Sequence, residues 1–275
     1  MTSSPRIAFL DVDGTILDHG KTVALSTIDA IRTARARGHL VLLSTGRAAS
    51  DIHPTVREIG FDGVISNGGA FARVGDETVL ARTMPVDAVD RLTAYFETDG
   101  VLYFLQTDHG VYASERVHRV VDEMRRRWGI ENDPAAAPRF RDLADLDRGD
   151  VAKAVFMSED AGTVARAQAD LGDAFHVVPG SMPLPGGSNG EVGMRGVTKG
   201  SAILSVLEHL GRDAADAIGI GDSWNDVEMF EVCGVGIAMG NAEPALKAIA
   251  DEVTTSVSTD GVARAFERHG LIPMP

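Results

Sequence analysis

The chain has 275 residues, so at roughly 150 residues per domain its length predicts about two domains. Apolar residues make up 44% and charged residues 24%, which is typical of a globular protein and excludes a disordered chain, a coiled coil or a collagen-like fibre. Acidic residues number 40 against 26 Lys and Arg, and the net charge of −14 argues against general nucleic-acid binding. An anionic substrate would therefore need a local positive site.

Cysteine content and hydropathy predict the compartment. The single cysteine, Cys233, excludes an internal disulfide and a cysteine-based zinc cluster. The first residues lack a basic region followed by a long apolar run, so no signal peptide is predicted. No stretch approaches the roughly 18 apolar residues of a membrane span. We therefore expect a soluble cytoplasmic protein with no membrane partner.

The first 65 residues alternate strand and helix. Residues 7–10 and 40–43 are short apolar runs that each end in a polar glycine-containing turn, and a predicted helix lies between them. Residues 64–65 give a third short strand, and residues 70–82 alternate around a Gly-Asp turn, which predicts a hairpin. This order indicates βαβ units and a parallel sheet, in which ligands bind at the carboxyl ends of the strands.

The middle of the chain has a different pattern. Strands and helices over residues 86–178 predict a smaller α+β unit, followed by a Pro/Gly/Ser-rich run over residues 179–190 that is typical of a linker. Strand–helix alternation returns after residue 198. The simplest organisation is one α/β domain interrupted by an inserted domain.

Four polar clusters fall where loops should lie at one edge of the α/β sheet. Asp11 and Asp13 follow the first strand, and with Asp222 they form a set of hard oxygen ligands that Mg²⁺ prefers. A carboxylate can also attack phosphorus to form an aspartyl-phosphate. Lys199 and Thr45 offer donors to phosphoryl oxygens. Together the clusters predict phosphoryl transfer, which needs mostly positioning and charge stabilisation.

Each cluster taken alone has a structural alternative. An Asp-x-Asp-Gly segment is commonly a plain turn, and Thr45 could simply shape a strand-to-helix turn. Lys199 at a helix start could be a solvated lysine, and Asp222 could be a helix N-cap. The order of all four clusters within one α/β domain favours the functional interpretation.

The same segments resemble the motifs of the haloacid dehalogenase superfamily of phosphatases. The four motifs are Asp-Val-Asp-Gly-Thr at 11–15, Ser-Thr-Gly-Arg at 44–47, Lys199 within Gly-Val-Thr-Lys-Gly, and Gly-Asp-Ser-Trp-Asn-Asp at 221–226. Residues 65–69, 235–242 and 259–263 resemble the Cof-type branch. The resemblance implies a Rossmann-like, doubly wound parallel sheet core over residues 1–83 and 188–275, and an inserted α+β cap over residues 84–187.

The resemblance also implies catalytic and metal-binding roles. Asp11 would attack phosphorus, and Asp13 would protonate the leaving alcohol and then deprotonate the hydrolytic water. Mg²⁺ would be held by Asp11, the backbone carbonyl of Asp13, and Asp222. Asn225 and Asp226 would support the metal site.

Further residues are candidates for contacts with the substrate. The residues implied at the phosphoryl oxygens are Thr45, Gly46 and Lys199. Arg47 either reaches the substrate or is a solvated surface residue. Trp224 either stacks on a ring of the leaving group or covers the sheet edge, and Asn189 either contacts substrate or shapes a turn.

These observations lead us to expect a monomeric or homodimeric, Mg²⁺-dependent phosphatase. Its substrate would be a small phosphorylated metabolite, either a sugar phosphate or a phosphorylated cofactor. Two alternatives stay open. A phosphohexomutase would share the four motifs, and a non-catalytic regulator could bind a phosphorylated ligand. The presence of both Asp11 and Asp13 argues against the regulator, because binding alone needs neither a nucleophile nor an acid/base group.

Overall fold

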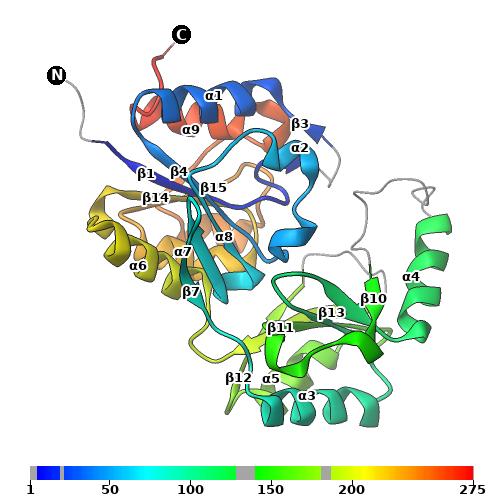
Figure 1. Cartoon of the computed structure of the whole chain (residues 1–275). Coiled ribbons are helices and arrows are strands. Elements are labelled where there is room, and N and C mark those ends of the chain that lie inside the picture. The colour runs from blue at the N-terminus through cyan, green and yellow to red at the C-terminus, as the bar shows by residue number, and fades with distance from the viewer. Residues whose placement is uncertain (1–4, 19–21, 128–139, 181–186, 275) are drawn as a thin grey trace. The chain divides into compact units, whose positions relative to one another are not determined.

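A computed structural model describes residues 5–18, 22–127, 140–180 and 187–274 (Figure 1). The chain divides into two compact units. The first contains the N-terminal segment to Arg47, residues Ile52–Ala81 and the segment from Thr198 onward. The second contains Arg82–Val197 together with Ala48–Asp51.

The first unit is built on an eight-stranded sheet. Six strands are parallel, and a hairpin adds two antiparallel strands at one edge, as the alternation over residues 70–82 predicted. In spatial order the strands are β16 (Glu252–Val253), β15 (Val235–Ala238), β14 (Ala217–Gly221), β1 (Ile7–Leu10), β4 (Leu40–Ser44), β5 (Gly63–Ser66), β6 (Phe71–Val74) and β7 (Glu77–Ala81). A small separate hairpin joins β2 (Leu17–Asp18) to β3 (Thr22–Val23).

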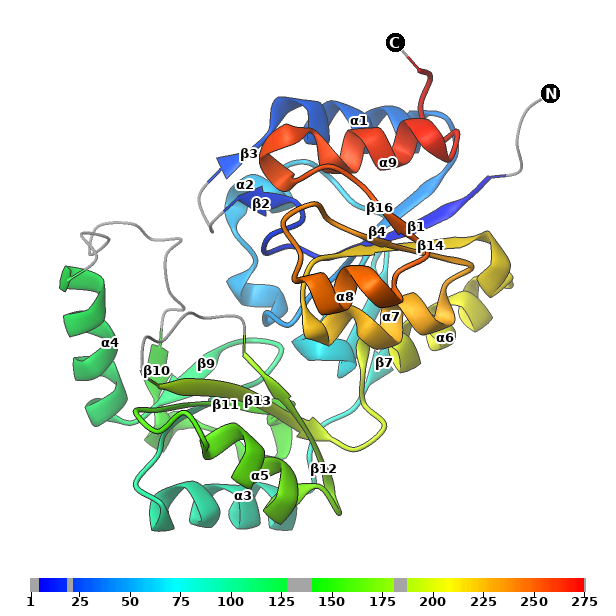
Figure 2. The same cartoon turned by 180° about the vertical axis from the view of Figure 1, so that it is seen from behind.

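Helices cover both faces of this sheet, as Figures 1 and 2 show. Two apolar clusters, one on each face, contain the inward-facing side chains of the strands and of the helices above and below them. On one face lie α1 (Leu25–Ala36), α2 (Pro54–Arg57) and α9 (Gly261–Arg268); on the other lie α6 (Lys199–Leu210), α7 (Val227–Val232) and α8 (Pro244–Ile249). Burial on both faces explains why the central strands are continuous apolar runs. The predicted doubly wound α/β fold is confirmed.

The strand order creates a switch point at β1. From β1 the chain proceeds outward to β4 and β5 on one side and later returns to β14, β15 and β16 on the other. In such sheets the loops diverge beyond the carboxyl ends of the central strands and leave a crevice for ligands. Asp11, Thr45 and Asp222 directly follow β1, β4 and β14, so the fold collects them at this edge.

The second unit is a six-stranded, mostly antiparallel sheet with helices packed on it. Its apolar core lies between one face of the sheet and α3 and α5, and α4 packs against β8 and β9 with a smaller apolar cluster. The strands in spatial order are β10 (Phe140–Asp142), β9 (Val111–Ala113), β8 (Leu102–Gln106), β11 (Lys153–Ser158), β13 (Ser188–Met194) and β12 (Phe175–Pro179). The helices are α3 (Val86–Thr98), α4 (Glu115–Arg127) and α5 (Thr163–Leu171).

The last residues of the run predicted as a linker form part of a strand in the structure. Residues 181–186 of that run lie outside the described residues. Pro179 closes β12, and Ser188–Met194 form β13, which pairs with both β11 and β12. Residues 188–197, expected in the core domain, therefore belong to the second unit. No helix within the described residues combines the length and apolar character needed to cross a bilayer.

Candidate active site

A buried lysine joins two of the predicted acidic residues. Asp11 is 5% exposed, and its backbone N–H donates to the carbonyl of Ile220 on the neighbouring β14 at 2.9 Å. The Lys199 ammonium, 1% exposed, donates to Asp11 Oδ1 and to Asp226 Oδ1, each at 2.6 Å. The solvated alternative for Lys199 therefore does not apply. A lysine with two carboxylate partners can remain charged in a buried site.

The start of α6 determines where Lys199 lies. Thr198 is the N-cap, its hydroxyl accepts a hydrogen bond from the Ser201 N–H at 3.2 Å, and the Ser201 hydroxyl accepts one from the Thr198 N–H at 3.0 Å. This reciprocal capping box fixes the first turn of the helix. Lys199 follows directly, so its side chain leaves the helix from a rigid point.

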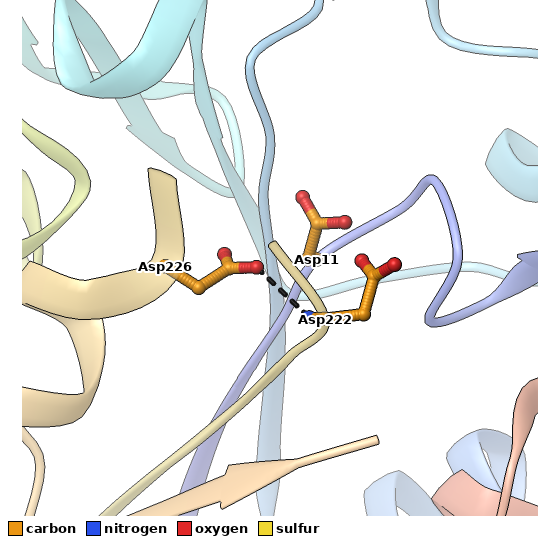
Figure 3. A group of neighbouring side chains, drawn as sticks. All are labelled: Asp11, Asp222 and Asp226. Atoms are coloured by element: carbon orange, nitrogen blue, oxygen red, sulfur yellow. Dashed lines mark hydrogen bonds between the residues drawn. The ribbon is translucent and has the colours of Figure 1, made fainter. Parts of the chain in front are cut away.

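Asp226 organises the loop after β14. Its Oδ2 accepts hydrogen bonds from the N–H groups of Asp222 at 3.0 Å and Ser223 at 3.1 Å, and the first of these is drawn in Figure 3. Ser223 is the N-cap of the following helical turn, Trp224–Asp226. The alternative in which Asp222 caps the helix is therefore wrong, and Asp222 is left available for other contacts.

Asp222 lies against a glycine of the first motif. A side-chain carbon on Gly14, whose φ is 82°, would lie 2.0 Å from Asp222 Oδ2, so only glycine permits this approach. Asn241 Nδ2 donates to the Gly14 carbonyl at 2.9 Å and lies 3.4 Å from Asp222 Oδ2. The sequence alone predicts no role for Asn241, although this residue lies in the segment 235–242 that resembles the Cof-type branch.

Burial and the closeness of like charges shift the pKa values of the residues in the site. Burial, with the nearby Asp226 carboxylate, raises the pKa of Asp222 to about 7. Burial also raises the pKa of Asp11 well above its ordinary value, although the Lys199 ammonium opposes the shift. For Lys199 itself, burial lowers the pKa, but the charges of Asp11 and Asp226 outweigh it and raise the pKa. Carboxylates crowded in this way are typical of functional sites.

The acidic residues can accept a divalent cation. Asp11, Asp222 and Asp226 each offer an oxygen within 4.8 Å of the others, and Figure 3 shows the three carboxylates grouped at the ends of their loops. Both oxygens of Asp226 already accept hydrogen bonds from Lys199 and from backbone N–H groups. Asp222 Oδ1, in contrast, is buried and has no hydrogen-bond partner among the described residues. Asp11 and Asp222 therefore fit the role of metal ligands better than Asp226, which fits the supporting role.

Asp13 and Arg47 form an ion pair. Arg47 Nε donates to Asp13 Oδ2 at 2.7 Å, and Arg47 Nη2 donates to Asp13 Oδ1 at 2.8 Å. The Asp13 side chain is 39% exposed and that of Arg47 is 20% exposed. The structure thus links the first and second motifs through their side chains.

The turn after β4 is held from a neighbouring loop. Thr45 is buried, and its hydroxyl accepts a hydrogen bond from the Arg47 N–H at 3.2 Å. The N–H groups of Asn67 and Gly68 donate to the carbonyls of Arg47 at 2.8 Å and Thr45 at 3.0 Å. Gly46 lies between these anchored residues, in the same turn.

The remaining candidates lie in different places. Trp224 is partly exposed, and its indole N–H donates to Glu243 Oε2 at 3.2 Å. Asn225 Oδ1 accepts a hydrogen bond from the Ser223 hydroxyl at 2.9 Å, within the loop after β14. Asn189 is buried in β13 of the second unit, so it does not shape a turn, and its expected contact with substrate stays a prediction.

Comparison with known proteins gives consistent matches over nearly the whole chain. The family of haloacid dehalogenase-like hydrolases matches residues 8–266. YkrA of Bacillus subtilis, to which a phosphatase activity is provisionally ascribed, is 30% identical over 269 residues, covering 97% of this chain and 98% of that protein. Pyridoxal phosphate phosphatase YbhA of Escherichia coli is 27% identical over 274 residues, covering 96% and 98%. The solved structure of a haloacid dehalogenase-like hydrolase from Bacillus subtilis matches with a TM-score of 0.81 at 24% identity, covering 96% and 99%.

Proposed function

This chain belongs to the haloacid dehalogenase-like hydrolases and is a phosphatase, and we propose that it hydrolyses phosphomonoesters of small metabolites through an aspartyl-phosphate on Asp11 with the aid of Mg²⁺. The observation that carries the proposal is the contact between Asp11 and the buried Lys199 at the switch point of the sheet. A carboxylate fixed beside a positive charge is suited to receive a phosphoryl group.

The first chemical step uses Asp11 and Asp13. Asp11 attacks phosphorus, the bond from phosphorus to the leaving oxygen breaks, and Asp13 gives its proton to that oxygen. Lys199 and Thr45 donate to the non-bridging oxygens of the phosphoryl group. The Lys199 ammonium favours the charged, nucleophilic form of Asp11, because it opposes the rise in the Asp11 pKa that burial causes.

The second step returns the enzyme to its starting state. Asp13 takes a proton from a water molecule, the water oxygen attacks phosphorus, and the bond between phosphorus and Asp11 breaks. Inorganic phosphate is released, and Asp13 holds a proton taken from the water molecule, in place of the one that left with the alcohol. Two carboxylates therefore suffice for both proton transfers and for the covalent intermediate.

The donor set of the site fits Mg²⁺, a cation that prefers carboxylate and carbonyl oxygens. Asp11, Asp222 and the backbone carbonyl of Asp13 would hold the ion, and Asn225 and Asp226 would support the loop that carries Asp222. When bound, the ion supplies positive charge that offsets the repulsion between Asp11 and a phosphate dianion.

We assign the substrate to the sugar phosphates or phosphorylated cofactors. Support for the second class is that one relative, YbhA, is named for pyridoxal phosphate. The second unit, inserted in the chain between β7 and α6, is proposed as the cap that selects the leaving group. Residues 188–197 belong to this cap, because β13 is part of its sheet.

Phosphate release from a panel of phosphorylated metabolites tests the proposal. Wild-type protein with Mg²⁺ is expected to release phosphate from at least one substrate and to stop when EDTA removes the metal. Asp11→Asn is expected to lose activity by about 10³-fold or more, since an amide does not form the covalent intermediate. Circular dichroism and thermal unfolding show whether the variant remains folded.

Asp62→Asn is the matched control for Asp11→Asn. Asp62 accepts hydrogen bonds from Arg35 and from the N–H of Val41 at the opposite end of β4, so this variant should keep wild-type activity per folded molecule. Release of phosphate by Asp11→Asn at a near-normal rate would remove Asp11 as the nucleophile. Interconversion of hexose phosphates without net phosphate release would favour the mutase.

A further inference from the structure

The ion pair between Arg47 and Asp13 has the geometry of a fork. Two different nitrogens of one guanidinium each donate to a different oxygen of one carboxylate, at 2.7 and 2.8 Å. Such bidentate pairs restrict rotation of the carboxylate as well as its position. A lysine at position 47 could supply the charge but not the planar fork.

The backbones on both sides of the pair are also fixed. The N–H of Arg47 donates to the buried Thr45 hydroxyl, and its carbonyl accepts from the N–H of Asn67. Asp13 forms a backbone bridge with Leu17, and the N–H of Gly14 donates to the Leu17 carbonyl at 2.9 Å. The fork therefore connects two rigid turns, one after β1 and one after β4.

The fork fixes the directions in which the Asp13 side chain can exchange a proton. A carboxylate has about four lone-pair sites, and the fork uses one on each oxygen. Because the plane of the carboxylate is fixed, the remaining lone pairs point in fixed directions. The Asp13 side chain is 39% exposed, so a proton carried at one of these lone pairs can be given to a leaving group, and a free lone pair can take a proton from a water molecule.

We propose that Arg47 is a positioning residue, which holds the Asp13 carboxylate in the orientation needed to transfer a proton to the leaving oxygen. The inference rests on the proposed function, since it concerns the acid/base group of that reaction. It replaces the alternatives for Arg47 as a solvated residue and as a direct ligand of the substrate. The exposed fraction of 20% and the fork to Asp13 favour the positioning role.

The dependence of kcat/KM on the leaving group distinguishes a positioning role of Arg47 from a role in binding the substrate. An alkoxide needs a proton to leave, whereas p-nitrophenolate is a stable anion that leaves with little protonation. We therefore compare kcat/KM for an alkyl phosphate accepted by the wild type with kcat/KM for p-nitrophenyl phosphate. Arg47→Lys is expected to lower the first by about tenfold to 100-fold, a part of the 10²–10⁴-fold typical of a general acid, and the second by less than about threefold.

A double substitution tests whether Arg47 acts through Asp13. Asp13→Asn should show the same selective loss for the alkyl phosphate. Adding Arg47→Lys to Asp13→Asn should not change the ratio of the two kcat/KM values further, because the group to be positioned is already absent. Equal losses for both substrates in Arg47→Lys, or an unchanged effect of Arg47→Lys in the Asp13→Asn background, would overturn the positioning role.

Arg35→Gln is the matched control. Arg35 also directs two guanidinium nitrogens at an aspartate, Asp62, at 3.0 and 2.8 Å, in the same unit but beside the start of β4. Its loss should lower the melting temperature and leave the ratio of kcat/KM values unchanged. If the wild type releases no phosphate from either substrate, the proposed function fails; if it does and Arg47→Lys shows no selectivity, only the positioning role fails.

Discussion

The Lys199 ammonium is one positive charge among three clustered carboxylates. Asp11 and Asp226 each lie 2.6 Å from it, and Asp222 lies within the same group of oxygens. Burial of carboxylates without enough countercharge costs stability, and the raised pKa values of Asp11 and Asp222 express that cost. The crowding of these carboxylates therefore lowers the stability of the folded protein.

His39 is a buried titratable group at the opposite end of the same strands. Its Nδ1 accepts a hydrogen bond from the N–H of Arg6 at 2.9 Å, which requires that nitrogen to be unprotonated. Burial lowers the pKa of His39 from 6.5, and the positive charges of Arg37, Arg6 and Arg212 act in the same direction. The folded protein therefore keeps His39 neutral at a pH where the unfolded chain takes up a proton.

Stability is thus predicted to depend on His39 in mildly acidic solution. Through His39, the unfolding free energy should fall as the pH decreases below about 6.5, because at this group the unfolded state then binds one more proton than the folded state. Asp222, whose pKa is raised to about 7, acts in the opposite direction, so the effect of His39 between about pH 7.5 and 5.5 is the difference between the wild type and His39→Gln. Urea unfolding at the two pH values measures it, and His39→Gln should show a smaller loss than the wild type. An equal loss in the two proteins would assign the acid sensitivity to other groups.

At the scale of elements, the turn between β5 and β6 joins two parts of the site. Residues Asn67–Gly69 have φ values of 52°, 67° and 107°, all in the left-handed region. The N–H groups of Asn67 and Gly68 hold the turn after β4, as described above, while Gly69 packs on the N-cap of α6. One short turn therefore positions both the residues after β4 and the helix that begins at Lys199.

Gly69→Ala is predicted to damage the site. A side-chain carbon there would lie 2.1 Å from the Thr198 carbonyl oxygen, so the start of α6 must move and Lys199 with it. We expect kcat/KM to fall by about tenfold or more, since displacement of a positioning group by about 1 Å can cost 10²-fold. The measurement is kcat/KM per folded molecule, alongside thermal unfolding.

Gly68→Ala is the matched control for this prediction. Gly68 also has a positive φ, but a side-chain carbon there meets nothing within 4 Å. Its effect should be limited to backbone strain of about 1–2 kcal/mol in stability, with kcat/KM unchanged. Equal effects of the two substitutions on kcat/KM would mean that strain alone, and not the contact with α6, disturbs the site.

The elements predicted best from the sequence were the continuous apolar strands and the helices of the first unit. The strands of the α/β sheet and the helices between them were confirmed, because buried parallel strands are apolar on both faces. β13 was missed because its first residues, Ser188–Gly190, have the composition of a linker. Gly190 is small because the Phe156 ring lies against it: an added side-chain carbon would be 2.4 Å from that ring. A glycine required by a neighbour's side chain cannot be distinguished in one sequence from a glycine of a flexible segment.

The candidate site was predictable as a set of residues but not as a set of contacts. The motifs predicted the family, which is confirmed, and placed Asp11, Thr45 and Asp222 at one edge of the sheet. They could not predict that Asp226 holds the loop after β14 or that Arg47 pairs with Asp13. Such partners are chosen by side-chain rotamers, which depend on the packing of residues far apart in the chain.

At the scale of the whole molecule, the net charge of −14 attracts cations, and folding brings Asp11, Asp222 and Asp226 together into a group that could hold one. A ligand that binds only the folded protein raises the unfolding free energy. We predict that Mg²⁺ at about ten times its dissociation constant stabilises the wild type by about 1.4 kcal/mol. Thermal unfolding with Mg²⁺ and with EDTA measures the effect without any substrate.

Asp222→Asn should remove most of this stabilisation, because it replaces a carboxylate with a buried oxygen that has no hydrogen-bond partner in the part of the chain that the structure describes. Asp62→Asn, which changes a carboxylate at the other end of β4, should retain it. The same Mg²⁺ effect in all three proteins would place the binding of the cation elsewhere on the acidic surface.

The position of β1 in the sheet affects how the protein is made. Ile7 pairs in register with Leu40 on one side and with Ala217 on the other, so the second neighbour of β1 is synthesised about 210 residues after it. At roughly 5–20 residues per second, the ribosome needs roughly 10–40 s to reach that neighbour. By then every strand of the second unit has been synthesised, while β1 still has one unpaired edge of backbone N–H and C=O groups. The nascent chain must be protected from aggregation during this interval, and faster elongation through the inserted unit would shorten it.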